Sequence, residues 1–113
     1  MLEAPSFKES AVALPDRDHH ISLAAAAALT KRYQAASPKA EKAEAFHGDQ
    51  VRSMLAQSGC VGLRIYYGLN ADGTPALVLA GIDASDNDLT GTLLEFGFPC
   101  PPICGGGDAL NGG

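Results

Sequence analysis

The strongest structural signal in the chain lies at Gly59-Cys60-Val61-Gly62-Leu63-Arg64-Ile65-Tyr66-Tyr67-Gly68. Apolar side chains recur there at every second position, which is typical of a β-strand. The turn residues of Asn70-Ala71-Asp72-Gly73 follow, and a second apolar run covers residues 75–82. Because this second run is apolar on both faces, we expect it to be the covered, central strand of a β-hairpin.

A third strand is predicted over residues 92–98, where Leu94, Phe96 and Phe98 take alternate positions. Two helices are expected before the hairpin. The first covers residues 22–36, because Ser22 can cap it, five consecutive alanines favour it and a proline at position 38 ends it. The second covers residues 49–58 and ends at a glycine.

These patterns predict an α+β fold in which two helices pack on a small antiparallel β-meander of about three strands. Residues 1–20 contain two prolines and charges of both signs, so we expect an extended N-terminal arm. Residues 21–98 are the predicted α+β domain. Residues 99–113 form a tail rich in Cys, Pro and Gly.

The composition suggests a thin core for a chain of 113 residues. Hydrophobic residues make up 46%, but many are alanine, and aromatic residues make up only 6%, with no Trp. A chain of this length needs most of its large apolar side chains to build one domain. We therefore expect a partner or a second copy to bury part of the apolar surface.

The charge excludes two classes of partner. The formal net charge is −5, and the 8 Lys and Arg residues do not cluster, so we expect no binding to nucleic acid or to an anionic membrane surface. No apolar run is long enough to span a membrane. Residues 1–18 carry several charges and two prolines, unlike a secretory signal, so the sequence predicts a cytoplasmic protein with reduced thiols.

The tail contains two of the three cysteines, Cys100 and Cys104, on either side of Pro101-Pro102-Ile103. Three interpretations are open. The cysteines can be buried apolar side chains that anchor the tail. They can form a reversible disulfide, because a proline turn can bring them within reach. They can also be half of a zinc site, completed by Cys60 and one histidine from the set His19, His20 and His47.

No catalytic motif is present. The chain lacks the nucleophile elbow, the P-loop, the dinucleotide fingerprint and the His-Glu-x-x-His motif. Cys60 follows a predicted helix C-terminus, where the helix dipole disfavours a thiolate. The acidic stretch at residues 83–88 does not match the spacing of a calcium loop. The sequence favours a non-enzymatic role with no cofactor, zinc being the alternative.

The predicted sheet carries two candidate interface residues. Arg64 and Tyr66 share one face of the first strand, so Arg64 can stack on Tyr66 or pair with Glu95 from a neighbouring strand. Tyr and Arg are favoured at the centres of protein interfaces. We predict Arg64 and Tyr66 as interface residues, together with Phe98 and Ile103 from the tail.

Several segments together resemble a family of small bacterial proteins that has no established activity. They are residues 59–68, Leu77-Val78-Leu79, Asn87-Asp88-Leu89 and Pro99-Cys100-Pro101-Pro102-Ile103-Cys104. The resemblance covers residues 45–104, and it implies no functional residues.

Three functional hypotheses follow. The first is a structural protein that assembles with itself, as a homo-oligomer or a filament, through its terminal arms. Thin cores and extended arms favour strand addition or tail docking into a neighbour. The second is a thiol-based metal-binding or redox module that uses Cys100 and Cys104. The third is a precursor whose C-terminal peptide is modified.

Overall fold

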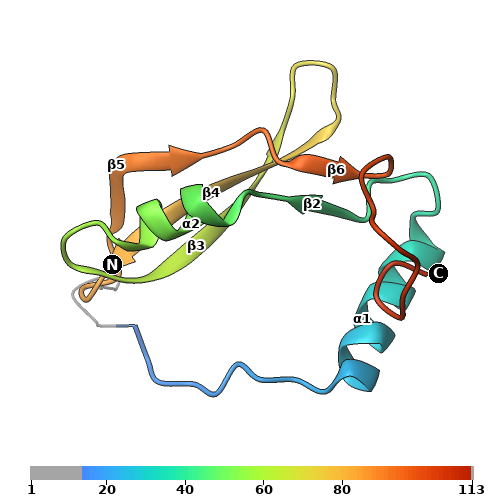
Figure 1. Cartoon of the computed structure of the whole chain (residues 1–113), viewed down its shortest axis with the longest axis horizontal. Coiled ribbons are helices and arrows are strands. Elements are labelled where there is room, and N and C mark those ends of the chain that lie inside the picture. Colours follow the sequence, from blue (N-terminus) through green and yellow to red (C-terminus); the bar gives the residue numbers. More distant parts are fainter. Residues whose placement is uncertain (1–13, 113) are drawn as a thin grey trace, which may run out of the picture. The chain divides into compact units, whose positions relative to one another are not determined.

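The computed structural model of the chain describes residues 14–112. They form two compact units (Figure 1). The first unit contains residues 14–16 and His47–Phe96, and the second contains Arg17–Phe46 and residues 97–112. The boundaries predicted at residues 20 and 98 both lie within the second unit.

An antiparallel sheet forms most of the first unit. Its strands are β3 (Cys60–Leu69), β4 (Pro75–Asp83) and β5 (Asp88–Leu94), in the order β3-β4-β5. The β3–β4 turn is closed by the N–H of Asn70, which donates to the Thr74 carbonyl at 2.8 Å, and by Gly73 with a φ of 87°. The predicted α+β fold with a three-stranded antiparallel meander is confirmed.

The third strand begins earlier than predicted, at Asp88 instead of residue 92. The Asp83 carboxylate accepts hydrogen bonds from the N–H groups of Ser85 and Asn87, each at 2.9 Å, so the chain reverses within a tight turn. At the other end the strand stops before Phe96, which has a φ of 62°. Phe98, predicted to end the third strand, belongs to β6 in the second unit.

Helix α2 (Gly48–Leu55) packs on this sheet (Figure 1). Met54 of α2 is fully buried, together with Leu79, Ala80 and Ile82 of the central strand. The side chain of Gln57 ties the end of the helix to the sheet, because its Oε1 accepts the Thr92 N–H at 3.1 Å. None of the helices in the described residues is long and apolar enough to cross a membrane.

The second unit contains helix α1 (Leu23–Ala36) and a two-stranded antiparallel sheet. Ser22 caps α1 as predicted, since its hydroxyl accepts the Ala25 N–H at 3.1 Å. The sheet pairs β2 (Ala43–Ala45) with β6 (Phe98–Cys100), two segments that are far apart in the sequence. The sequence did not predict β2, because residues 39–47 alternate charges with alanines.

Gly81 of β4 marks a close approach between the sheet and the end of α2, and it supplies a first prediction. A Cβ at this position would lie 2.9 Å from the Cys60 Sγ and 3.0 Å from the Gln57 Nε2. We expect Gly81→Ala to lower the free energy of unfolding by roughly 1–3 kcal/mol, as overpacked cores do. Urea denaturation followed by circular dichroism measures this change.

Gly68→Ala is the matched control, because a Cβ there meets only the Ala76 carbonyl, at 3.5 Å. It should leave the free energy of unfolding within about 0.5 kcal/mol of the original chain, or raise it slightly. Adding Cys60→Ala to Gly81→Ala should recover part of the lost stability. Equal denaturation midpoints for the two alanine variants would show that the approach at Gly81 is not tight.

Candidate functional site

One face of the β3-β4-β5 sheet carries a cluster of charged and phenolic groups. The Arg64 Nη1 of β3 donates to the Asp88 Oδ1 of β5 at 2.7 Å. The Arg64 Nη2 pairs with the carboxylate of Asp86, which lies in the β4–β5 turn. The Tyr66 hydroxyl donates to the second oxygen of Asp88. Asp88 therefore joins Arg64 and Tyr66, and the guanidinium is neutralised by two carboxylates.

These contacts shift the ionisation of all three groups in directions that keep the cluster intact. The hydrogen bond from Tyr66, and then Arg64, holds the pKa of Asp88 below its ordinary value of 3.8. The same bond raises the pKa of Tyr66 above 10.0, because the phenol must lose the proton that it donates. The bond to Asp88 also raises the pKa of Arg64. At neutral pH Arg64 and Asp88 form an ion pair, and the neutral phenol of Tyr66 donates a hydrogen bond to the same carboxylate.

The structure brings the two predicted sheet residues together but corrects the predicted partner of Arg64. Glu95 is not that partner, because β5 runs from Asp88 to Leu94 and Glu95 follows its end. The strand begins with Asp88, whose backbone pairs with Ile82, and this register carries its carboxylate toward Arg64. Sequence reasoning missed Asp86 and Asp88 because they were read only as turn residues.

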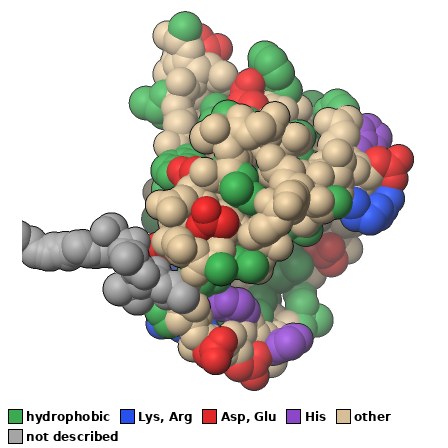
Figure 2. Space-filling view, turned by 90° about the vertical axis from the view of Figure 1, so that its left-hand side faces the viewer, with side chains coloured by type: hydrophobic (Ala, Val, Ile, Leu, Met, Phe, Trp, Pro, Cys, Tyr) green, Lys and Arg blue, Asp and Glu red, His purple; other side chains and the backbone are tan. Residues whose placement is uncertain are grey.

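The opposite face of β3 is apolar. Its alternate side chains, which we call the β3 stripe, are between 38% and 92% exposed: Val61, Leu63, Ile65, Tyr67 and Leu69. Helix α2 lies on this same face, since Gly81 is paired with Leu63 and points toward Gln57 and the Met54 carbonyl. Figure 2 shows hydrophobic side chains on the projection at its top, which is the β3–β4 hairpin of Figure 1. α2 therefore covers only part of the face.

The predicted metal ligands are not brought together. Cys100 and Cys104 form a disulfide with a Cα–Cα distance of 4.7 Å, so neither sulfur is available as a thiolate ligand. Cys60 belongs to the first unit, where its thiol donates to the Gly62 carbonyl at 3.2 Å. Within residues 14–112, no group of three or more His, Cys, Asp or Glu residues could hold a metal ion. The structure contains the disulfide, and Cys100 is also buried, as the first interpretation expected.

The other two predicted interface residues belong to the second unit. Phe98 begins β6 opposite Ala45, and the Ile103 N–H donates to the Pro99 carbonyl at 2.9 Å. Both side chains are exposed. The predicted interface set is thus divided, with Arg64 and Tyr66 in the first unit and Phe98 and Ile103 in the second.

The chain itself holds most of its C-terminal tail. Asn111 donates to the carbonyls of Cys104 and Gly106, at 3.3 and 3.0 Å, and so closes the loop that follows the disulfide. The Gln34 Nε2 of α1 donates to the Leu110 carbonyl at 2.9 Å, and the Lys42 Nζ donates to the Asn111 carbonyl at 2.7 Å. Residues 105–112 therefore need no second copy to hold them. The predicted arm at residues 1–13 lies outside the described residues.

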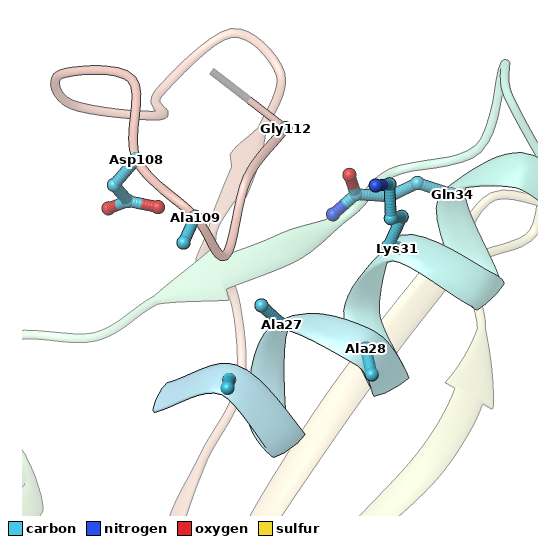
Figure 3. A pocket seen from close by; sticks show the side chains of 8 residues that line it. Ala27, Ala28, Lys31, Gln34, Asp108, Ala109 and Gly112 are labelled. Carbon is cyan, nitrogen blue, oxygen red and sulfur yellow. The ribbon is translucent and has the colours of Figure 1, made fainter. Parts of the chain in front are cut away.

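A cavity of about 570 Å³ lies between α1 and this C-terminal loop (Figure 3). Its walls are mostly alanine methyl groups, with Lys31 and Gln34 on α1 and Asp108 on the loop. The amide of Gln34 is engaged with the Leu110 carbonyl, and the Asp108 Oδ1 accepts the N–H groups of Leu110 and Asn111. Gln34 and Asp108 therefore stabilise the loop itself.

Comparison with known proteins yields no match to this chain among family models, curated proteins or solved structures. The resemblance to small bacterial proteins stays a prediction.

The hydrogen bond from Tyr66 to Asp88 leads to a prediction about pH. A folded-state pKa below 3.8 means that ionised Asp88 stabilises the fold above about pH 3.8. This stability is lost as the pH falls through the lower, folded-state value. Tyr66→Phe removes the largest cause of the shift, so we expect the pKa of Asp88 to rise toward 3.8. Carbon-detected NMR titration of the Asp88 carboxyl group measures it.

Tyr67→Phe is the control, because it removes a hydroxyl from the neighbouring residue on the opposite face of β3. The Asp88 titration should not change in this variant. The acid-induced loss of stability should be shallower in Tyr66→Phe than in Tyr67→Phe. An Asp88 pKa that is the same in both variants would contradict the proposed role of the phenol.

Proposed function

We propose that this chain is a non-enzymatic protein that associates with itself, and that the β3 stripe is its interface. The observation that carries the proposal is an edge strand of ten residues whose apolar side chains are exposed at every second position. Long apolar edge strands are ready templates for pairing with another chain, and natural proteins usually protect them with charges, prolines or bulges. Between Gly62 and Leu69, β3 has none of these on its apolar face.

The energies involved are sufficient for association. Fully burying one large apolar side chain stabilises by roughly 1.5–3 kcal/mol relative to leaving it exposed. Two copies would contribute ten partly exposed side chains, five from each stripe. Association costs roughly 4–15 kcal/mol in lost rotational and translational freedom. Partial burial of the stripes, with new backbone hydrogen bonds along the edge, is of the size needed to offset this cost.

This proposal moves the interface away from the terminal arms. The described part of the C-terminal tail already forms bonds to α1 and to Lys42 of its own chain. Its backbone groups are therefore less available to a neighbour than those of β3. The stripe is also the expected consequence of a thin core, because its large apolar side chains are exposed where a bigger core would cover them.

The proposal predicts how charge on the stripe changes the oligomeric state. We expect the original chain to sediment as an oligomer whose population rises with concentration. Ile65→Lys and Tyr67→Lys place a charge in the stripe, so each should weaken association by about tenfold or more. Sedimentation velocity at several concentrations measures this, and circular dichroism establishes that each variant is folded.

Phe96→Lys is the matched control, because Phe96 is a large apolar residue with 87% exposure that lies outside β3. It should associate like the original chain. A monomer at all concentrations, or equal weakening by all three lysines, would overturn the proposal that the stripe is the interface.

The disulfide favours a second candidate function, a thiol-based redox module. The bond between Cys100 and Cys104 lies between β6 and the loop that contacts α1. A dithiol reductant would convert it into two thiols and would itself become a disulfide, so the exchange balances in electrons and protons. In a reducing cytoplasm, the location that the sequence predicts, such a bond is reversible, and its loss would release residues 105–112 from the direction that it imposes.

Hydrogen exchange tests this second function. Reduction, or Cys104→Ser, should increase the exchange of the Leu110 and Asn111 amides, which the Asp108 carboxylate holds in the oxidised loop. Cys60→Ser is the control, since its sulfur lies outside the disulfide. Unchanged exchange after complete reduction, verified by thiol titration, would show that the disulfide does not control the loop.

A further inference from the structure

We infer that two copies of the chain pair β3 with β3 in antiparallel orientation, around a two-fold axis at Ile65, and so join two three-stranded sheets into one of six strands. The inference rests on the proposed self-association and adds its symmetry and register.

The backbone orientation of β3 follows from the hairpin. The Asn70 N–H bonds to the Thr74 carbonyl, and the register then pairs Leu69 with Pro75 and Gly68 with Ala76. In an antiparallel ladder, residues alternate between those bonded to the neighbouring strand and those whose N–H and C=O point away. From Gly62 to Gly68, the even-numbered residues of β3 therefore bond to β4. The odd-numbered residues, which also form the stripe, present their N–H and C=O groups at the outer edge.

Only odd-numbered residues can therefore bond across a new edge, and this limits the register. Pairing Ile65 with the partner subunit's Ile65 places Leu63 opposite the partner subunit's Tyr67 and Val61 opposite the partner subunit's Leu69. Leu63, Ile65 and Tyr67 of both copies are paired in this register, whereas Val61 lies at the register shift between Cys60 and Gly62 and adds less. A shift of two residues toward the N-terminus places Arg64 opposite the partner subunit's Arg64. A shift toward the C-terminus shortens the paired stretch to residues 63–69, so the register centred on Ile65 is favoured.

The same register suits the other face of β3. It places Gly62 opposite the partner subunit's Gly68, where two small residues allow close approach. It also places Arg64 opposite the partner subunit's Tyr66. Both side chains reach across β4 to Asp88 of their own chain, so neither obstructs the new edge. The charge of Arg64 is already balanced by Asp86 and Asp88 of its own chain, so two copies bring no unpaired charges together.

Charge also explains why this edge, and not another surface, would join two copies. The chain has a net charge of −5, so two copies repel each other over most of their surfaces. The stripe has no charged side chain, and β3 contains no acidic residue. The other edge of the sheet, β5, begins with Asp88 and has seven residues, and its pairing with β4 is interrupted in the middle, features that discourage pairing. In β3 the register shift lies at the start of the strand, between Cys60 and Gly62.

The symmetry predicts a closed dimer. A two-fold pairing uses the same edge in both copies, so each β3 is consumed and no further copy can add there. Of the two assemblies that the sequence suggested, a homo-oligomer and a filament, this geometry favours the homo-oligomer.

Cysteine cross-linking of the full chain tests the register. In a Cys60→Ala background, Ile65→Cys should form a disulfide-linked dimer on mild oxidation, because directly bonded antiparallel pairs have Cα atoms about 5.5 Å apart. Leu63→Cys and Tyr67→Cys should each fail to cross-link alone, since four residues of offset separate identical positions by about 13 Å. A mixture of these two variants, one of them tagged, should cross-link.

Each outcome separates the inference from the proposed function. Cross-linking of Leu63→Cys with itself would show a parallel pairing or an antiparallel register centred on Leu63. A dimer by sedimentation without either predicted link would show another surface. Both results overturn the register and leave self-association standing. A monomer at all concentrations overturns both. Hydrogen exchange identifies one further result: protection of the Leu63, Ile65 and Tyr67 amides that does not depend on concentration would show that the chain covers its own edge, which also overturns the inference.

Discussion

The length of α2 is the constraint on which the rest of the first unit depends. The helix has eight residues and is about 12 Å long, whereas the ten residues of β3 extend over about 33 Å. One short helix can bury Met54 against β4, but it cannot also cover an adjacent strand along its whole length. Because the described part of this unit contains no second helix, the apolar side chains of β3 are exposed. The β3 stripe is therefore exposed because α2 is too short to cover it and the described part of the unit has no other helix.

The two faces of β3 have different structural roles. On the even-numbered face, Arg64 crosses the buried Ala80 of β4 to reach Asp88 on β5, so one charged network ties the outer strands to each other across the central one. On the odd-numbered face, small and apolar groups allow α2 to approach, and Gly81 makes room for the Cys60 sulfur. Exposed ion pairs contribute little stability individually. The network instead neutralises Arg64, the only charged residue of β3, within its own chain. The proposed pairing of two β3 edges would therefore bring no unpaired cation into the interface.

Local patterns allowed the first unit to be predicted better than the second. The alternation from Val61 to Tyr67 and the turn at Asn70 are encoded by neighbouring residues, and β3, β4 and their hairpin follow from them. The start of β5 depends on the Asp83 side chain capping a turn, so the strand began four residues earlier than expected. The pairing of Ala43 with Cys100 joins segments more than fifty residues apart. Neither segment has an alternating hydrophobic pattern that would predict a strand. The partner of Arg64 could not be predicted for the same reason: it depends on the register of β5.

The tail shows how a feature that dominates a sequence can have a local role. Cys100, Cys104 and the glycines after them suggested a free arm that needed neighbours to hold it. The disulfide instead fixes the direction in which the chain leaves β6, and Asn111 then closes the loop with its own side-chain bonds. Backbone entropy lost in residues 105–112 is offset within one chain, by Gln34 and Lys42 among others. Since the described tail forms its hydrogen bonds within the chain, the outer edge of β3, which has no partner strand among residues 14–112, is the stronger support for the proposed self-association.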